Sequence, residues 1–218
     1  MKIHENRFSL LLISIMLITF SRTAAAQTID ESLLSIESRW AAASQQSNER
    51  QQVTSLKKLL RDARQLHEEH PQKAEAAVWH GIVARSFMDA KGLKASSGIA
   101  REARDAFLSA ESLNPTIFGG LVYANLGALY TKASSKFGGF GNKTKGLGYF
   151  WKAIVMDPDG LDSNYLYAKM LVDEKDYESA YDALLRASNA STHYLHSSAD
   201  NARRLEIAEL LATVEKRL

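Results

Sequence analysis

Three prolines, Pro71, Pro115 and Pro158, constrain what this chain can fold into more than any other feature of the sequence. They are separated by 44 and 43 residues, and each follows an amphipathic run that ends in a polar residue. Proline cannot continue a helix, and it disfavours helical backbone at the residue before it. The prolines therefore mark equivalent ends of one recurring helical unit.

The residues upstream of the prolines repeat as well. A small residue is followed four positions later by a large apolar one and three positions after that by another small one. Residues at this spacing share one helix face, so the large side chain can pack between two close helix approaches. The third copy lies 34 residues after the second and has no proline. The copies are Ala103, Phe107 and Ala110; Gly146, Phe150 and Ala153; and Ala180, Leu184 and Ala187.

A helix of matching pattern precedes each triplet. In the middle unit, the large residues Tyr123, Leu126 and Tyr130 surround the small Gly127, which would let a neighbouring helix approach closely. The two helices and the terminal proline resemble the tetratricopeptide repeat, a helix pair of about 34 residues. HEAT repeats, at about 40–47 residues, are nearer in length to the first two units. The 34-residue step into the last unit favours the tetratricopeptide interpretation.

Hydrophobic periodicity predicts an all-α chain with about nine helices and no strand. We expect a tetratricopeptide-like solenoid of antiparallel helix pairs that ends in a capping helix. The expected helices span residues 28–43, 48–69, 74–90, 98–113, 118–134, 144–156, 162–174, 177–189 and 201–217. The expected domain plan is a signal peptide (1–26) and a single repeat domain (27–218), made of N-terminal helices (27–73), repeats (74–117, 118–160 and 161–195) and a capping helix (196–218).

The two ends of this array carry specific expectations. Thr28 and Glu31 have the spacing of a capping box, which predicts a helix start at Thr28. The last helix is expected to bury one apolar side and to present charges elsewhere. The apolar side comprises Leu205, Ala208, Leu211, Ala212 and Val214.

The first 26 residues have the pattern of a secretory signal peptide. A weakly basic start precedes an uncharged apolar run at 8–20, and alanines at 24–26 provide a cleavage site before Gln27. A membrane anchor is the alternative, but the run falls short of the roughly 20 residues that a spanning helix needs. We expect cleavage near Ala26–Gln27 and a secreted or periplasmic protein that is soluble and has no stable membrane anchor.

Composition narrows the possible functions. The chain has no cysteine, which excludes disulfide scaffolds, cysteine-ligated metal domains and lipid attachment through a thiol. Its 27 basic and 25 acidic residues become 24 of each once residues 1–26 are removed. A net charge of zero with interspersed signs argues against a nucleic-acid partner.

Several segments between residues 74 and 218 also resemble a particular family. These segments are Trp79–Ile82, Phe137–Gly141, Asp157–Tyr167, Ala199–Arg204 and Glu206–Ile207. They are similar to the T component (TatT-like) proteins associated with tripartite ATP-independent periplasmic (TRAP) transporters. The resemblance implies an exported α-helical protein that docks a protein partner, namely a solute-binding subunit, and assists the uptake of an apolar solute.

In tetratricopeptide solenoids the first helix of each pair lines a concave groove that binds ligands. The groove positions here are Ala77, His80, Ala84, Phe87, Leu121, Ala124, Ala128, Thr131, Asp162, Tyr165, Lys169 and Val172. Most of the positions from Ala77 to Thr131, which belong to the first two repeats, are small and apolar. Such a groove suits an apolar peptide or, as the alternative function, a small apolar ligand held by a carrier. Burial of these faces against the N-terminal helices is an equally open interpretation. The candidate partner-binding or ligand-binding residues are His80, Phe87, Thr131, Phe137, Phe140, Tyr165 and Lys169.

Other residues with chemical potential fit structural roles. His67 and His70 lie three apart, which is not the H-E-x-x-H spacing of a metalloprotease, and His193 and His196 fall in an expected loop. The glycine-rich segment 137–148 lacks the Gly-Lys-Ser/Thr sequence of a phosphate-binding loop. Its phenylalanines either cover a pocket, contact a partner or pack on their own repeat. No catalytic spacing is present. We expect no enzyme activity, no cofactor and no metal, and a homo-oligomer is compatible with the sequence.

Overall fold

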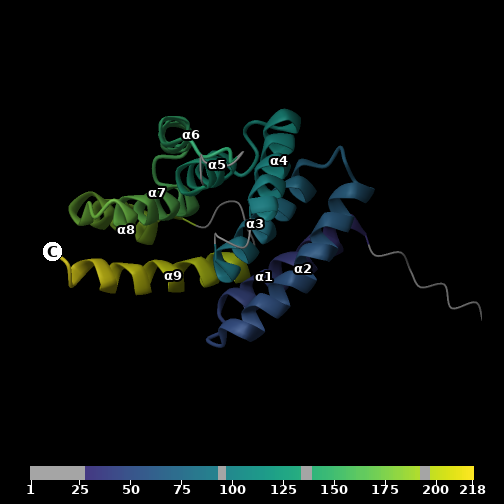
Figure 1. The fold of residues 1–218 in the computed structure, drawn as a ribbon, viewed down its shortest axis with the longest axis horizontal. Helices are drawn as coiled ribbons and strands as arrows, with labels where there is room; N and C mark the ends of the chain where they lie inside the picture. Colours follow the sequence, from purple (N-terminus) through teal and green to yellow (C-terminus); the bar gives the residue numbers. More distant parts are fainter. Residues whose placement is uncertain (1–27, 93–96, 134–138, 192–196) are drawn as a thin grey trace, which may run out of the picture.

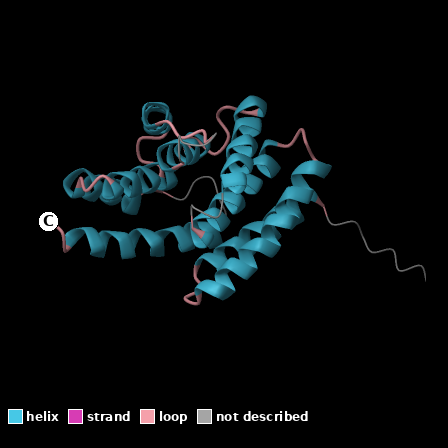
Figure 2. Ribbon diagram, in the orientation of Figure 1, coloured by secondary structure: helices cyan, strands magenta, loops and turns pink. Residues whose placement is uncertain are grey.

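The computed structural model describes residues 28–92, 97–133, 139–191 and 197–218, and every regular element in these ranges is a helix (Figure 2). The helices are α1 (Ile29–Ser44), α2 (Glu49–Glu69), α3 (Ala74–Lys91), α4 (Ser97–Leu113), α5 (Leu121–Lys132), α6 (Lys143–Met156), α7 (Leu161–Asp173), α8 (Tyr177–Asn189) and α9 (Ser197–Glu215). The all-α prediction is thereby confirmed. The predicted signal peptide lies outside the described residues, and none of the helices just given is long and apolar enough to cross a membrane.

Consecutive helices pack as pairs, and the pairs stack along the chain (Figure 1). The pairs are α1 with α2, α3 with α4, α5 with α6 and α7 with α8. The first helices of successive pairs also meet, because α5 packs on both α3 and α7. α9 lies along α8 and reaches α1, so the C-terminal helix spans from the last pair back to the first (Figure 1).

The three prolines follow helix ends, as the sequence predicts. α2, α4 and α6 each end two residues before a proline. The residues directly before two of them, His70 and Asp157, have left the helical region, with φ of −128° and −144°. The capping box also forms: the Thr28 hydroxyl accepts from the Glu31 backbone N–H, and the Glu31 carboxylate accepts from the Thr28 backbone N–H.

The start of the fifth helix differs from the prediction. We expected it at residue 118, whereas α5 begins at Leu121. Phe118 and Gly119 have positive φ values of 51° and 60°, and this left-handed backbone cannot continue a right-handed helix. The chain therefore makes a turn after Pro115 before α5 starts.

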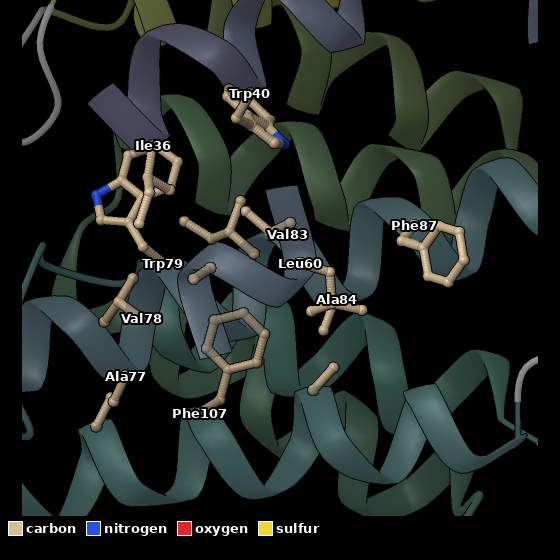
Figure 3. Close-up of a cluster of buried hydrophobic side chains, with 14 of the residues drawn as sticks. Ile36, Trp40, Leu60, Ala77, Val78, Trp79, Val83, Ala84, Phe87 and Phe107 are labelled. Atoms are coloured by element: carbon tan, nitrogen blue, oxygen red, sulfur yellow. The ribbon is translucent and has the colours of Figure 1, made fainter. Parts of the chain in front are cut away.

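A glycine faces a phenylalanine ring inside the first two repeats. In the first repeat, a Cβ atom placed on Gly81 would lie 2.8 Å from the ring carbons of Phe107, so the ring occupies the space that the glycine leaves. The Phe107 ring points from α4 toward α3 and is completely buried (Figure 3). The second repeat has the same arrangement with Gly127 and Phe150. In the last repeat Ala168 and Leu184 occupy the corresponding sequence positions, and both are fully buried.

The buried side of α9 matches the prediction only in part, since Val214 is fully buried and Leu211 is partly buried. Leu205, expected to be buried, is 53% exposed, and Ala208 and Ala212 are exposed as well. Helix α9 contacts α1 as well as α7 and α8, so its buried surface is not a single apolar side. The buried residues of α9 are Ala199, Asp200, Ala202, Arg203, Ile207 and Val214.

Candidate functional site

Most of the expected groove is occupied by the chain itself. Ala77, Ala84 and Ala124 have no exposed surface. Helices α1 and α2 pack on α3, and the indole of Trp40 meets that of Trp79 edge-on, with centroids 5.9 Å apart (Figure 3). These small residues therefore belong to the hydrophobic core. Ala77 and Ala84 are buried in a cluster that includes the N-terminal helices, as one interpretation of the sequence expects, whereas Ala124 is buried among residues of α6, α7 and α8.

His80 lies in a polar network between α2, α3 and α4 rather than beside the other candidates. Its Nε2 lies 2.7 Å from Glu102 Oε1, and its Nδ1 lies 3.0 Å from His67 Nδ1. A carboxylate only accepts, so His80 Nε2–H donates to Glu102, and in neutral His80 the Nδ1 accepts from His67. Arg64 also donates to both Glu102 oxygens. Burial opposes the charge of Glu102, but the hydrogen bonds from His80 and Arg64 outweigh it and lower the Glu102 pKa.

This network predicts that acid destabilises the protein. Burial, and secondly His80, lower the pKa of His67, while Glu68 partly opposes them. A folded-state pKa below the unfolded value means that stability is present above the unfolded pKa and is lost as pH falls toward the folded one. We expect the free energy of unfolding, measured by urea titration, to fall as the pH is lowered through about 6.5, the ordinary pKa of histidine. His67→Gln should flatten this dependence, and an unchanged slope would contradict the assignment.

Three further candidates pack locally. Phe87 is buried, with Lys91 Nζ 5.7 Å from its ring centroid. The Thr131 hydroxyl donates to the Gly127 carbonyl within α5. Phe140 stands edge-on to Tyr130 and lies under the Arg104 guanidinium, 4.6 Å from its ring centroid. Phe140 therefore packs on its own chain, and Phe137 lies outside the described residues.

Tyr165 and Lys169 are brought together with charged residues of other helices. The Arg203 guanidinium of α9 lies 4.6 Å from the Tyr165 ring centroid, and Lys169 Nζ lies 5.6 Å from it. Arg203 Nε donates to Asp162 Oδ1 at 2.7 Å, and Arg203 also pairs with Glu206. Burial and the Glu206 carboxylate raise the pKa of Tyr165, so its hydroxyl stays protonated. This network fastens α9 to α7.

The cavity beside these residues is lined by charged groups. It has a volume of about 230 Å³ and lies between α1, α2, α3, α7 and α9. Its charged lining residues are Arg85, Asp89, Lys169, Arg203 and Glu206. An apolar ligand would cover these groups without giving them hydrogen bonds, which is unfavourable. The lining therefore disfavours an apolar ligand in this cavity.

Helix α6 presents apolar side chains to solvent. Trp151 is 71% exposed and Val155 is 61% exposed, and Leu147 and Met156 are also exposed. Leu147, Trp151 and Val155 are spaced by four residues, so they form one stripe on the helix. We call Leu147, Trp151, Val155 and Met156 the α6 stripe. Large exposed side chains gathered in this way mark interaction surfaces.

Comparison with solved structures bears on the fold. A thermophilic TPR (tetratricopeptide-repeat) protein of Thermus thermophilus superposes with a TM-score of 0.51, covering 84% of this chain and 91% of that one at 15% identity. The chain has a tetratricopeptide-repeat fold. Two structures of MamA give TM-scores of 0.42 and 0.43 at 14% and 13% identity; they cover 75% and 86% of this chain and 89% and 92% of theirs. No family model and no curated protein sequence matches the chain significantly.

Within this tetratricopeptide-repeat fold, sequence reasoning missed the α6 stripe and the buried cation Arg203. The α6 stripe has a signal in the sequence, since the apolar residues Leu147, Trp151 and Val155 repeat every four residues. They lie on a different side of the helix from Phe150, which packs inside the repeat. The sequence signal for Arg203 is weaker: it is a charged residue that directly follows Ala202 and precedes Ile207, both of which are apolar. Among the described residues, no three or more His, Cys, Asp or Glu side chains are grouped to hold a metal ion.

Proposed function

We propose that this protein is an exported, non-enzymatic tetratricopeptide-repeat scaffold that docks the solute-binding subunit of a TRAP-type transporter through the α6 stripe. The observation that carries the docking surface is the 71% exposure of Trp151 between Leu147 and Val155. Tryptophan is among the residues that contribute most to binding at protein interfaces. The kind of partner rests on the resemblance of residues 74–218 to T components.

The concave face of the solenoid is covered by other helices of the chain, which favours the α6 stripe as the docking surface. Solenoids of this class usually bind ligands there, but in this chain α1 and α2 cover α3, and α9 extends from α8 to α1. A partner protein is therefore expected to use the outer side of the array, where α6 lies (Figure 1).

Charge specifies the chemistry of the partner. Helix α6 carries Lys143, Lys145 and Lys152 and no acidic residue. Lys143 and Lys152 are more than half exposed, although they contact Glu174 and Glu111. The complementary surface is an apolar pocket for Trp151 that is bordered by carboxylates.

The test is direct binding between two purified proteins. Residues 27–218 are titrated with the solute-binding subunit of a TRAP transporter from the same organism, by surface plasmon resonance. Trp151→Ala should weaken binding by about 2 kcal/mol or more, roughly 30-fold. Leu205→Ala, an exposed apolar residue on α9, is the matched control and should bind like the wild type. Absence of binding, or equal affinity of the Trp151→Ala variant, would refute the proposal.

A further inference from the structure

Lys169 lies where two cavities meet. Together with Arg85 and Asp89 it lines both the cavity of about 230 Å³ and a smaller one of about 30 Å³ between α3, α5 and α7. The uncharged polar lining of the larger cavity is supplied by Ser44, Gln52, Ser86 and Tyr165. The site thus combines cations with neutral hydrogen-bonding groups in a small volume.

The other charged side chains that line the larger cavity are already paired with each other or with neighbouring residues. Asp89 accepts from Arg85 at 3.0 Å and from Lys132 at 3.0 Å. Arg85 Nε also donates to Asn125 at 2.6 Å. Arg203 is held by Asp162 and Glu206. Each of these carboxylates therefore has at least one cation in direct contact.

Lys169 differs from these cations. In the part of the chain that the structure describes, no carboxylate oxygen lies within ion-pair distance of its Nζ, which instead lies near the Tyr165 ring. Burial lowers the pKa of Lys169. Asp89 opposes burial most strongly, but Arg85 and Lys132 lower the pKa further, and Glu206 opposes them more weakly. A charge that is desolvated in this way gains most from a counter-ion supplied from outside.

We propose that the cavity binds a small organic monocarboxylate whose carboxylate pairs with Lys169. One negative charge completes the pairing, whereas a second would face Asp89 and Glu206 across the same cavity. The ligand is small because five helices surround about 230 Å³ and α9 crosses the face along which an extended peptide would lie. This binding site is separate from the α6 stripe and does not depend on the partner proposed for it.

The first test is isothermal titration calorimetry of residues 27–218 with butyrate, with its uncharged analogue butyramide and with the dicarboxylate succinate. We expect binding of butyrate and weaker or no binding of the other two. Lys169→Met, which keeps the apolar stem, should weaken butyrate binding about tenfold or more, the loss expected for a charge-assisted hydrogen bond. Lys58→Met, at an exposed site on α2, should leave it unchanged.

A second measurement keeps the proposal testable if Lys169→Met disturbs the fold. Lys169→Arg keeps the charge and should retain most of the butyrate affinity. In a spectrum of ¹³C-labelled lysines, butyrate should raise the pKa of Lys169, because an anion favours the protonated form. Failure to detect butyrate binding, equal affinities for butyrate and butyramide, or binding only of a peptide with a free C-terminal carboxylate would overturn the proposal.

Discussion

Replacing Phe107 by alanine should lower the free energy of unfolding by about 3–5 kcal/mol, the loss usual for a buried phenylalanine. The ring has no exposed surface and fills the space over Gly81, so its removal leaves a cavity between α3 and α4 that the glycine cannot fill. Urea unfolding followed by circular dichroism measures the change. Phe140→Ala, at a half-buried ring, is the matched control and should cost clearly less.

A double-mutant cycle tests whether the glycine and the ring act as a pair. Gly81→Ala alone should destabilise, because its Cβ would lie 2.8 Å from the Phe107 ring carbons. Combined with Phe107→Leu it reproduces the alanine and leucine of the last repeat and should cost less than the two single changes together. We expect a favourable coupling within about 0.5–3 kcal/mol, the range for residues in contact. Additive effects would show that the space over Gly81 does not limit the ring.

The helix pairs could be predicted from the sequence because their causes are local and repeated. Pro71, Pro115 and Pro158 end helices wherever they stand, and Phe107 and Phe150 pack against the preceding helix of the same unit. The turn before α5 could not be predicted in this way. It depends on the left-handed backbone of Phe118, a residue type that does not indicate positive φ.

The path of α9 could not be predicted for a different reason. A repeat pattern specifies contacts between neighbouring units, whereas α9 joins the last pair to the first. Its buried side depends on the bond from Arg203 to Asp162, and no hydrophobic period reveals a buried ion pair. The packing of α1, α2 and α9 on the repeats also decides what surrounds each groove candidate. Tyr165 and Lys169 face a cavity, while His80 faces the N-terminal helix α2, which the groove pattern does not include.

Arg203→Met should destabilise the protein about as much as the loss of Phe107, by about 3–5 kcal/mol. The change keeps an apolar stem but leaves Asp162 and Glu206 without the cation that they share. Burial opposes the Arg203 charge, yet the two carboxylates outweigh it and raise the Arg203 pKa, so the wild-type residue stays charged. Arg217→Met, beyond the end of α9 and exposed, should stay within about 0.5 kcal/mol of the wild type.

Two further measurements separate loss of the ion pair from loss of packing. Asp162→Asn added to Arg203→Met removes one uncompensated carboxylate and should recover part of the stability, because a buried charge without a partner is the main cost. Hydrogen exchange should show faster exchange throughout α9 in Arg203→Met and unchanged protection in α3 and α4, since local opening requires only that α9 leave α1, α7 and α8. Full protection of α9 in Arg203→Met would mean that its apolar contacts alone hold it across the array.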